Sequence, residues 1–347
     1  MWFYSLVFLI LIIFNGLAYF YKSSKIAYII SLFFLMLIAA FRPSTCCADY
    51  STYIDYYENI SNLPITFLEP SYFAISYFSK FVFNGYIGIF IVYSILGVGL
   101  KGFAIIRLTK YYSVSLILYF GSFFLLQEMT QIRVGVASAI LLLSIPNIQE
   151  KKSVRFFVLV LIGCIFHYSL LVFLPFYFVN VNVINKKAYI TAIVGVCIAT
   201  FAGLNFITII QYIRLGFLSD KITAYQLMLE KGMFGDISLI NPLLFLRIVI
   251  LVFFIVYSKE MVVKNKYSII ITKVYAFSII AFIGLSPLPA IAGRINQLLG
   301  VVEIVLVPYG IYLLRPKYLA VVLFVIFALM IMYKQLYYSD LMNGYFN

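Results

Sequence analysis

The residues best placed to do chemistry in this 347-residue chain are ionisable side chains inside or beside long apolar stretches. A charge at the centre of a membrane span costs about 3 kcal/mol on insertion scales, so each such residue is a functional hypothesis by default. The candidates are Arg133, His167, Arg247, Lys273, Arg294 and Glu303. Arginines predict the binding of an anion, whereas the histidine predicts proton transfer.

Four arginines are predicted to approach the outer leaflet of a membrane. They are Arg42, Arg133, Arg247 and Arg294. A guanidinium group binds phosphate oxygens bidentately and stays protonated, so four of them at one depth suit a diphosphate. For any single arginine, the alternatives are contact with lipid headgroups or an internal salt bridge, for example with Glu303.

Three side chains could transfer protons. His167 is the only histidine, and an apolar setting would keep its imidazole neutral and able to accept a proton. The alternative for His167 is a hydrogen bond between helices. Asp49 stands where a helix N-cap belongs, so it is a cap, a catalytic carboxylate or both. Glu69 precedes Pro70 at another predicted helix start, and because Glu is a poor N-cap a functional role is favoured.

A stripe of tyrosines follows Asp49. Tyr50, Tyr53, Ile54 and Tyr57 have the spacing of one helix face, which predicts a short helix with an aromatic side. Such a stripe could stack on sugar rings. The alternative is anchoring at the membrane surface, where tyrosines are enriched.

No other chemistry-bearing pattern is recognisable. The four cysteines form neither a zinc pattern nor a convincing disulfide framework, and there is no Asp-x-Asp pair for a metal. The chain has no glycine-rich phosphate loop, and its two long hydrophilic stretches, 42–69 and 207–237, are too short for a nucleotide-binding domain. An energised substrate must therefore arrive already activated, and we expect no metal and no cofactor.

The composition predicts the elements that hold these residues. With 65% hydrophobic and 11% charged residues, the chain has too few charges to cover a soluble globule. It is predicted to be an all-α, polytopic integral membrane protein, with residues 1–347 forming a single membrane domain. The net charge of +13 does not indicate nucleic-acid binding, because most of the surface must face lipid.

Apolar runs of suitable length predict ten membrane spans. They are 2–21, 26–41, 86–106, 112–127, 134–148, 188–206, 238–257, 267–286, 295–314 and 318–337. The stretch 154–183 is predicted to be a broken hairpin with His167 near its turn, which raises the total to about 12 crossings. The segment 70–83 is predicted to be a short, partly inserted helix.

Positive charge predicts the orientation of these spans. Fourteen of the 25 Lys and Arg residues fall on one side, with Glu150 and Glu260 as their only acidic companions, and short loops rich in Lys and Arg are cytoplasmic. Both termini and the loops 42–69 and 207–237 are then expected outside. The first helix has no basic residue before it, unlike a signal peptide, and is predicted to be retained.

Several of these residues together resemble the EpsG family of Wzy-type polysaccharide polymerases. They are Arg42 with Asp49-Tyr50 and Tyr53, Glu69-Pro70, the segment Gln131-Ile-Arg133-Val-Gly-Val-Ala, a basic turn, and Phe166-His167-Tyr-Ser-Leu. The resemblance covers roughly residues 40–180, with Gly293-Arg294 as a further match. Cys47 stands where the family pattern has Gly.

The resemblance implies a GT-C-like glycosyltransferase architecture and a place in a bacterial inner (cytoplasmic) membrane. It implies an enzyme that joins oligosaccharide repeat units of an O-antigen, capsule or exopolysaccharide on the periplasmic face. Donor and acceptor would be oligosaccharides on undecaprenyl diphosphate, and a partner protein that regulates chain length is compatible with this. Gln131 joins Tyr50, Tyr53 and Tyr57 as an expected sugar-binding residue.

Our mechanistic hypothesis assigns Arg42, Arg133 and Arg294, with Arg247 beside them, to the diphosphates, and His167, Asp49 or Glu69 to the acceptor hydroxyl. Two other classes stay open. A secondary transporter or flippase for an anionic or lipid-linked glycan would also have many spans, a broken hairpin and intramembrane charges. A membrane acyltransferase could use His167 as its base but needs an acyl donor.

Overall fold

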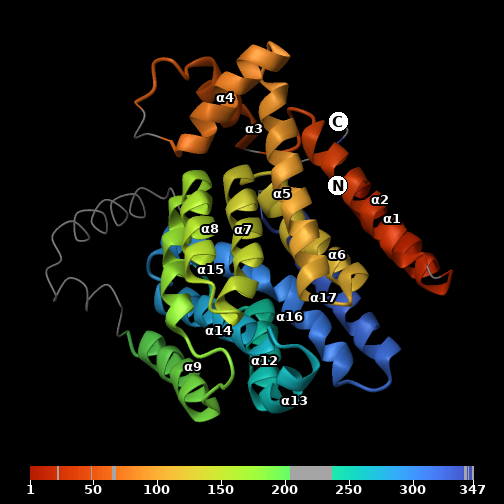
Figure 1. Cartoon of the computed structure of the whole chain (residues 1–347), viewed down its shortest axis with the longest axis vertical. Coiled ribbons are helices and arrows are strands. Elements are labelled where there is room, and N and C mark those ends of the chain that lie inside the picture. The colour runs from red at the N-terminus through yellow and green to blue at the C-terminus, as the bar shows by residue number, and fades with distance from the viewer. Residues whose placement is uncertain are drawn as a thin grey trace, which may run out of the picture. The chain divides into compact units, whose positions relative to one another are not determined.

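A computed structural model gives the fold of the chain (Figure 1). It describes all residues except 22, 48, 65–67, 204–236, 340–341, 343 and 346–347. The predicted loop 207–237 therefore lies, apart from Ile237, outside the described residues. The chain divides into two compact units: unit 1 comprises residues 1–177 and 304–347, and unit 2 comprises residues 178–303.

Every regular element among the described residues is a helix. In the first segment of unit 1 they are α1 (Trp2–Phe20), α2 (Ser24–Ala40), α3 (Asp49–Glu58), α4 (Pro70–Phe83), α5 (Ile87–Leu108), α6 (Tyr112–Tyr119), the π-helix η1 (Phe120–Glu128), α7 (Ile132–Gln149), α8 (Ser153–Phe166) and the 3-10 helix η2 (Tyr168–Phe178). Its second segment contains most of α16 (Glu303–Tyr309), then the 3-10 helix η4 (Gly310–Tyr312) and α17 (Lys317–Tyr337). Unit 2 contains α9 (Lys186–Phe201), α12 (Pro242–Val256), α13 (Ser258–Lys264), α14 (Ser268–Gly284), α15 (Pro289–Leu299) and the 3-10 helix η3 (Gly300–Val302).

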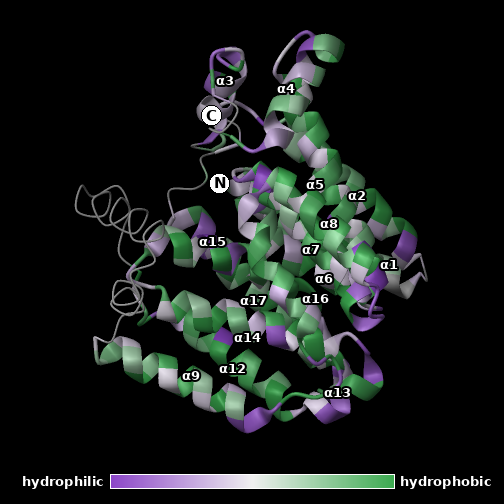
Figure 2. Ribbon diagram, turned by 60° about the vertical axis from the view of Figure 1, so that its left-hand side comes forward, coloured by the Kyte–Doolittle hydropathy of each residue, from purple (hydrophilic) through white to green (hydrophobic). Residues whose placement is uncertain are grey.

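The all-helical class is confirmed for the described part of the chain, and each predicted span coincides with one helix or a run of helices. Within the described residues, four stretches are long and apolar enough to cross a membrane: α5, α7, α17 and the run 289–312. The pair α12 and α13, bent by 75°, is a fifth if it forms one span. Other apolar helices have 10–17 residues. The total of about 12 crossings and the GT-C-like architecture stay predictions. Figure 2 shows hydrophobic residues along most of these helices and hydrophilic ones concentrated near their ends.

Unit 1 is organised around α5, which packs on α2, α4 and α7. Small residues allow close approach between these helices, as is usual in membrane bundles. Gly102 of α5 receives the Leu32 side chain of α2, because a Cβ at Gly102 would collide with it. The Tyr28 hydroxyl of α2 donates to the Gly102 carbonyl at 2.9 Å, so a buried polar group on this interface is satisfied.

The predicted break at His167 is confirmed. The α-helix α8 ends at Phe166, and His167 is extended, with φ −157° and ψ 116°. The chain continues as η2, whose Leu170 packs into the space left by Gly163. The His167 N–H still donates to the Gly163 carbonyl at 2.9 Å, so the break comes directly after the last hydrogen bond of α8 and His167 is its C-cap.

The short helix α4 buries mainly serines and exposes aromatic side chains. Its buried residues are Ser71, Tyr72, Ser76 and Ser79, and it packs on α5 and α8. Its exposed side includes Phe78 and Phe81. Small serines against neighbouring helices and aromatic rings outside suit a helix in contact with lipid, so partial insertion of α4 stays our prediction.

Candidate active site

Glu69 ends the loop before α4 and receives hydrogen bonds from two other elements. It occupies the N-cap position with φ −65° and ψ 144°, but its side chain makes no capping hydrogen bond. Pro70 follows at the first helical position, where the missing N–H is not needed. The carboxylate instead accepts hydrogen bonds from Arg133 of α7 through Oε2 and from His167 through Oε1. With 9% of its side chain exposed, Glu69 is buried between a cation and an imidazole.

His167 is held by Glu69 through one ring nitrogen. Its Nδ1 lies 2.8 Å from Glu69 Oε1, and 14% of the side chain is exposed. Because an ionised carboxylate can only accept, Nδ1 carries a proton, and in the neutral imidazole Nε2 then has the unshared electron pair. Nε2 is buried and has no hydrogen-bond partner among the described residues. This arrangement is that of a general base oriented by a carboxylate.

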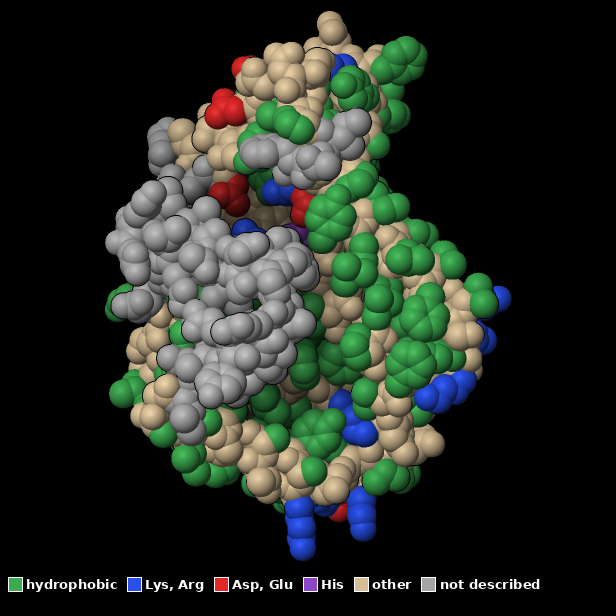
Figure 3. All heavy atoms as spheres, turned by 90° about the vertical axis from the view of Figure 1, so that its left-hand side faces the viewer, with side chains coloured by type: hydrophobic (Ala, Val, Ile, Leu, Met, Phe, Trp, Pro, Cys, Tyr) green, Lys and Arg blue, Asp and Glu red, His purple; other side chains and the backbone are tan. Residues whose placement is uncertain are grey.

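Arg133 is the second residue of α7 and completes the cluster. Besides Glu69 it interacts with Tyr53 of α3, because its guanidinium carbon lies 6.0 Å from the centroid of that ring. Its side chain is 23% exposed, more than that of Glu69, so part of the guanidinium is accessible. Figure 3 shows acidic, basic and histidine side chains gathered together on one face of the protein.

The two carboxylates respond oppositely to this environment. Burial raises the pKa of Glu69, but the His167 hydrogen bond and the Arg133 charge outweigh burial, so its pKa is lowered from the ordinary 4.5. Burial also dominates at Asp49 and raises its pKa, with only partial compensation by the Arg133 charge. Glu69 is therefore the ionised partner that fixes neighbours, while Asp49 is the more basic carboxylate near Arg133.

The guanidinium group of Arg42 makes most of its contacts with other residues of the protein. It is 3% exposed, donates from Nε to the Ala39 carbonyl at 2.8 Å and from Nη1 to the Met129 carbonyl, and lies over the Phe90 ring. Its Nη2 is buried and has no hydrogen-bond partner in the described part of the chain, and the same holds for the Oε1 of Gln131, the N-cap residue of α7. Both atoms lie beside residues 129–133, which lead from η1 into α7, because Arg42 donates to the Met129 carbonyl and Gln131 is part of this segment. Buried polar groups are normally satisfied, so these two and His167 Nε2 point to a polar ligand or water.

The tyrosine stripe forms one buried face of α3, as the spacing predicted. Tyr50 stacks on Phe90 with centroids 4.8 Å apart, and Tyr53 stacks on Tyr72 at 5.9 Å. Tyr57 lies under the ammonium of Lys80. The stripe therefore attaches α3 to α4 and α5, and sugar binding by these rings stays a prediction.

Comparison with known proteins adds one result. A family model described as the EpsG family matches residues 25–347. The chain belongs to the EpsG family. No curated protein and no solved structure matches the chain. The match runs from α2 to beyond α17, so every residue of the Glu69 cluster lies within the EpsG region. The family connects this membrane protein with polysaccharide biosynthesis and indicates a polymerase of the glycosyltransferase kind.

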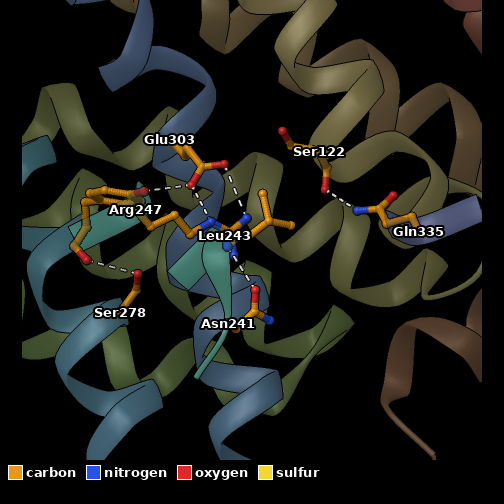
Figure 4. Close-up of polar contacts among 8 residues, drawn as sticks. Ser122, Asn241, Leu243, Arg247, Ser278, Glu303 and Gln335 are labelled. Carbon is orange, nitrogen blue, oxygen red and sulfur yellow. Dashed lines mark hydrogen bonds and ion pairs between the residues drawn. The ribbon is translucent and has the colours of Figure 1, made fainter. Parts of the chain in front are cut away.

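The other two predicted arginines of the EpsG-family chain lie in unit 2. Arg247 of α12 donates from Nε to Glu303 Oε2 at 2.8 Å and from Nη2 to Oε1 at 3.4 Å. Glu303 Oε2 also accepts from the Tyr275 hydroxyl at 2.7 Å, and Figure 4 shows Glu303 facing Arg247. Arg247 is thus in the internal salt bridge that was its alternative assignment. Arg294 is exposed on α15, and its role in substrate binding stays a prediction.

Two ionisable residues near the site were missed by the sequence analysis. Lys101 of α5 and Glu128 at the end of η1 form an ion pair with 0% and 1% of their side chains exposed. Their positions in the sequence could have identified both residues as candidates, because Lys101 interrupts the predicted span 86–106 and Glu128 directly follows the span 112–127. Lys273, a sequence candidate, donates to the carbonyls of Asn180 and Val183, each at 2.6 Å, which is a structural role in unit 2.

No obvious metal centre is present in the part of the chain that the structure describes. No group of three His, Cys, Asp or Glu side chains there is arranged to hold a metal ion. The neighbours Cys46 and Cys47 are buried free thiols, and the Cys47 thiol donates to the Met129 carbonyl at 3.0 Å. Cys46 contacts Cys47, and Cys47 contacts Met129, so we interpret both cysteines as structural support for residues 129–133.

Proposed function

We propose that this EpsG-family protein is a polysaccharide polymerase, a glycosyltransferase that joins oligosaccharide repeat units linked to undecaprenyl diphosphate. The reaction takes place on the periplasmic face of the bacterial inner membrane and extends an O-antigen, capsule or exopolysaccharide. The observation that carries the proposal is the buried cluster in which Glu69 accepts from both His167 and Arg133, while His167 Nε2 has no partner among the residues that the structure describes. This cluster unites a base and a cation, the two groups that transfer from a diphosphate needs.

His167 supplies the base in the proposed reaction. The acceptor hydroxyl oxygen forms a bond with the anomeric carbon of the donor, and its proton passes to His167 Nε2. The imidazolium formed in this way is stabilised by ionised Glu69 at Nδ1, 2.8 Å away. Such a positioned base typically contributes 10²–10⁴-fold to a rate. Asp49, with its raised pKa, is the alternative base.

Arg133 supplies the positive charge. As the bond between the anomeric carbon and the diphosphate oxygen breaks, the lipid diphosphate leaves with the electron pair, and a fixed guanidinium stabilises the developing charge. The partial exposure of Arg133 and its position in the first turn of α7 support this role, since helix N-termini also attract anions. The Nη2 group of Arg42, which has no partner among the described residues, is a further donor. The proposed step gives no role to a metal.

Gln131 and the face of α3 are proposed to contact the sugars. Gln131 lies two residues before Arg133, and its buried Oε1 has no partner in the described structure, so it can accept from a sugar hydroxyl. The guanidinium carbon of Arg133 lies 6.0 Å from the centroid of the Tyr53 ring, so a sugar bound beside the arginine would meet that ring. Tyr50 and Tyr57 extend the same helix face.

Reconstitution with lipid-linked repeat units tests the function. Purified protein in liposomes should convert the units into longer glycans, which gel electrophoresis resolves as a ladder. Arg133→Ala should abolish long chains, and His167→Gln should slow elongation by roughly 10²-fold or more, while both proteins insert normally. Exposed Lys152→Gln is the matched control and should keep wild-type chain lengths.

Three results would contradict the proposal. Substrate that crosses the bilayer without any new glycosidic bond would show a flippase or transporter. Wild-type chain lengths from Arg133→Ala would remove the arginine from the site. Full activity of His167→Gln together with an inactive Asp49→Asn would transfer the role of base to Asp49.

A further inference from the structure

The Lys101–Glu128 ion pair is buried and takes no part in the proposed reaction. Lys101 Nζ donates to Glu128 Oε1, and both side chains are inaccessible to solvent. The ammonium also lies 5.3 Å from the centroid of the Tyr119 ring. A pair of charges enclosed in this way loses its hydration, and one partner without the other is strongly destabilising.

Two glycines create the space for the Glu128 carboxylate. A Cβ atom at Gly97 of α5 or at Gly135 of α7 would collide with Glu128 Oε2. Gly97 lies one turn before Lys101 on the same helix, so both residues face the carboxylate. The carboxylate is thus confined between α5 and the first turn of α7.

The pair lies at the beginning of the turn that carries the substrate-binding residues. Glu128 ends η1, and Gln131 and Arg133 follow within five residues. The Ser138 hydroxyl of α7 donates to Gln127 Oε1 at 2.8 Å, and the Met129 carbonyl accepts from Arg42 and Cys47. The turn is therefore held from both flanks, and Lys101 is its attachment to α5.

We propose that Lys101 and Glu128 are positioning residues that hold the turn 128–133 so that Gln131 and Arg133 meet the lipid-diphosphate substrate. The inference rests on the proposed function. Stability alone does not account for the pair, because replacing a buried ion pair by uncharged residues of similar volume is often neutral or stabilising. An ion pair does, however, fix one register of η1 against α5, which apolar side chains that slide past one another do not.

The double variant Lys101→Met with Glu128→Gln separates positioning from stability. Lys101→Met alone leaves the Glu128 carboxylate without its partner, and Glu128→Gln alone leaves the Lys101 ammonium without its partner. Either single change should therefore lower the temperature of thermal unfolding. The double variant removes both charges and should regain the unfolding temperature of the wild type. We nevertheless expect its KM for the lipid-linked unit to be raised by about 10- to 100-fold, because small displacements of a substrate clamp are costly. The backbone amides of residues 129–135 should also exchange hydrogen faster than in the wild type.

The outcomes are distinguishable. A double variant with wild-type stability, KM and amide exchange would overturn the positioning role. Glu150→Gln, which removes a partly exposed partner of Lys152, is the control and should leave all three readouts unchanged. If wild-type protein makes no glycan, the proposed function fails instead. Binding of undecaprenyl diphosphate alone then decides the inference: weaker binding by the double variant supports it, and equal binding refutes it.

Discussion

A single buried carboxylate organises the candidate site. Glu69 is accepted as an ionised group in a poorly hydrated place because two donors, His167 and Arg133, share it. The two interactions reach across 98 and 64 residues of sequence, so Glu69 joins the α3–α4 loop to α7 and to the end of α8. Loss of this one group would free the imidazole and the guanidinium at the same time.

Acid pH should weaken this cluster. Because the folded-state pKa of Glu69 is lowered, its carboxylate stabilises the fold fully above the ordinary value of 4.5, and this contribution is lost as the pH falls through the lowered value. We expect the difference in unfolding free energy between wild type and Glu69→Gln to be constant from pH 7 to about 5 and to shrink below 4.5. Denaturant unfolding in detergent at a series of pH values measures it. A difference that grows with acid would refute the lowered pKa.

At the scale of elements, the glycines of α5 and α7 determine how closely the helices meet. Gly97→Ala should destabilise the protein by about 1–3 kcal/mol, because the new methyl group overpacks against the Glu128 carboxylate. Gly195 of α9 is the matched control, since nothing lies within 4 Å of a Cβ there. Gly195→Ala should stabilise by about 0.5–1 kcal/mol through helix propensity. Thermal unfolding of both variants checks the prediction, and a neutral Gly97→Ala would contradict the packing.

The elements themselves were accessible from the sequence. Apolar runs located the helices because their length and composition are local properties, and the start of α3 at Asp49 and the break at His167 also follow from local patterns. The pairing of the charged residues could not be predicted from the sequence, because it depends on which helices become neighbours. Glu69 and His167 were identified by type, yet nothing in the sequence indicated that one would hold the other.

The missed features have the same cause. Lys101 and Glu128 pair only because Gly97 and Gly135 admit the carboxylate between two helices. The π-helix that ends at Glu128 has no simple residue signature, so residues 112–127 were predicted to form one regular span. The tyrosine stripe was predicted correctly as a face, but its burial against Phe90 and Tyr72 is a tertiary property.

At the scale of the whole molecule, the orientation of the chain can be tested by labelling. Single cysteines are introduced at exposed Glu58 and at exposed Lys152 in a Cys197→Ser background, because Cys46, Cys47 and Cys164 are buried. A membrane-impermeant maleimide added to spheroplasts should label position 58, whereas position 152 should react only after permeabilisation, because basic loops stay cytoplasmic. The Cys197→Ser parent is the control. The reverse pattern would move the candidate site to the cytoplasmic side.

Unit 1 is assembled from two segments that are far apart in the sequence. The Tyr309 hydroxyl donates to the Leu108 carbonyl at 2.9 Å, and the Gln335 amide of α17 donates to the Ser122 carbonyl of η1 at 2.7 Å. These contacts connect the second segment to the helices that lead into the turn carrying Arg133. The residues of unit 2 lie between the two segments in the chain.

This interleaving constrains the order of events during biosynthesis. The ribosome must translate all of unit 2 before α17 can dock on η1, a delay on the order of ten seconds at typical elongation rates. During that interval the Ser122 carbonyl lacks the Gln335 amide, and the unpaired helices offer surfaces to the insertion machinery or a membrane chaperone. The nascent protein would therefore carry Glu69, Arg133 and His167 of the candidate site before α17 completes unit 1.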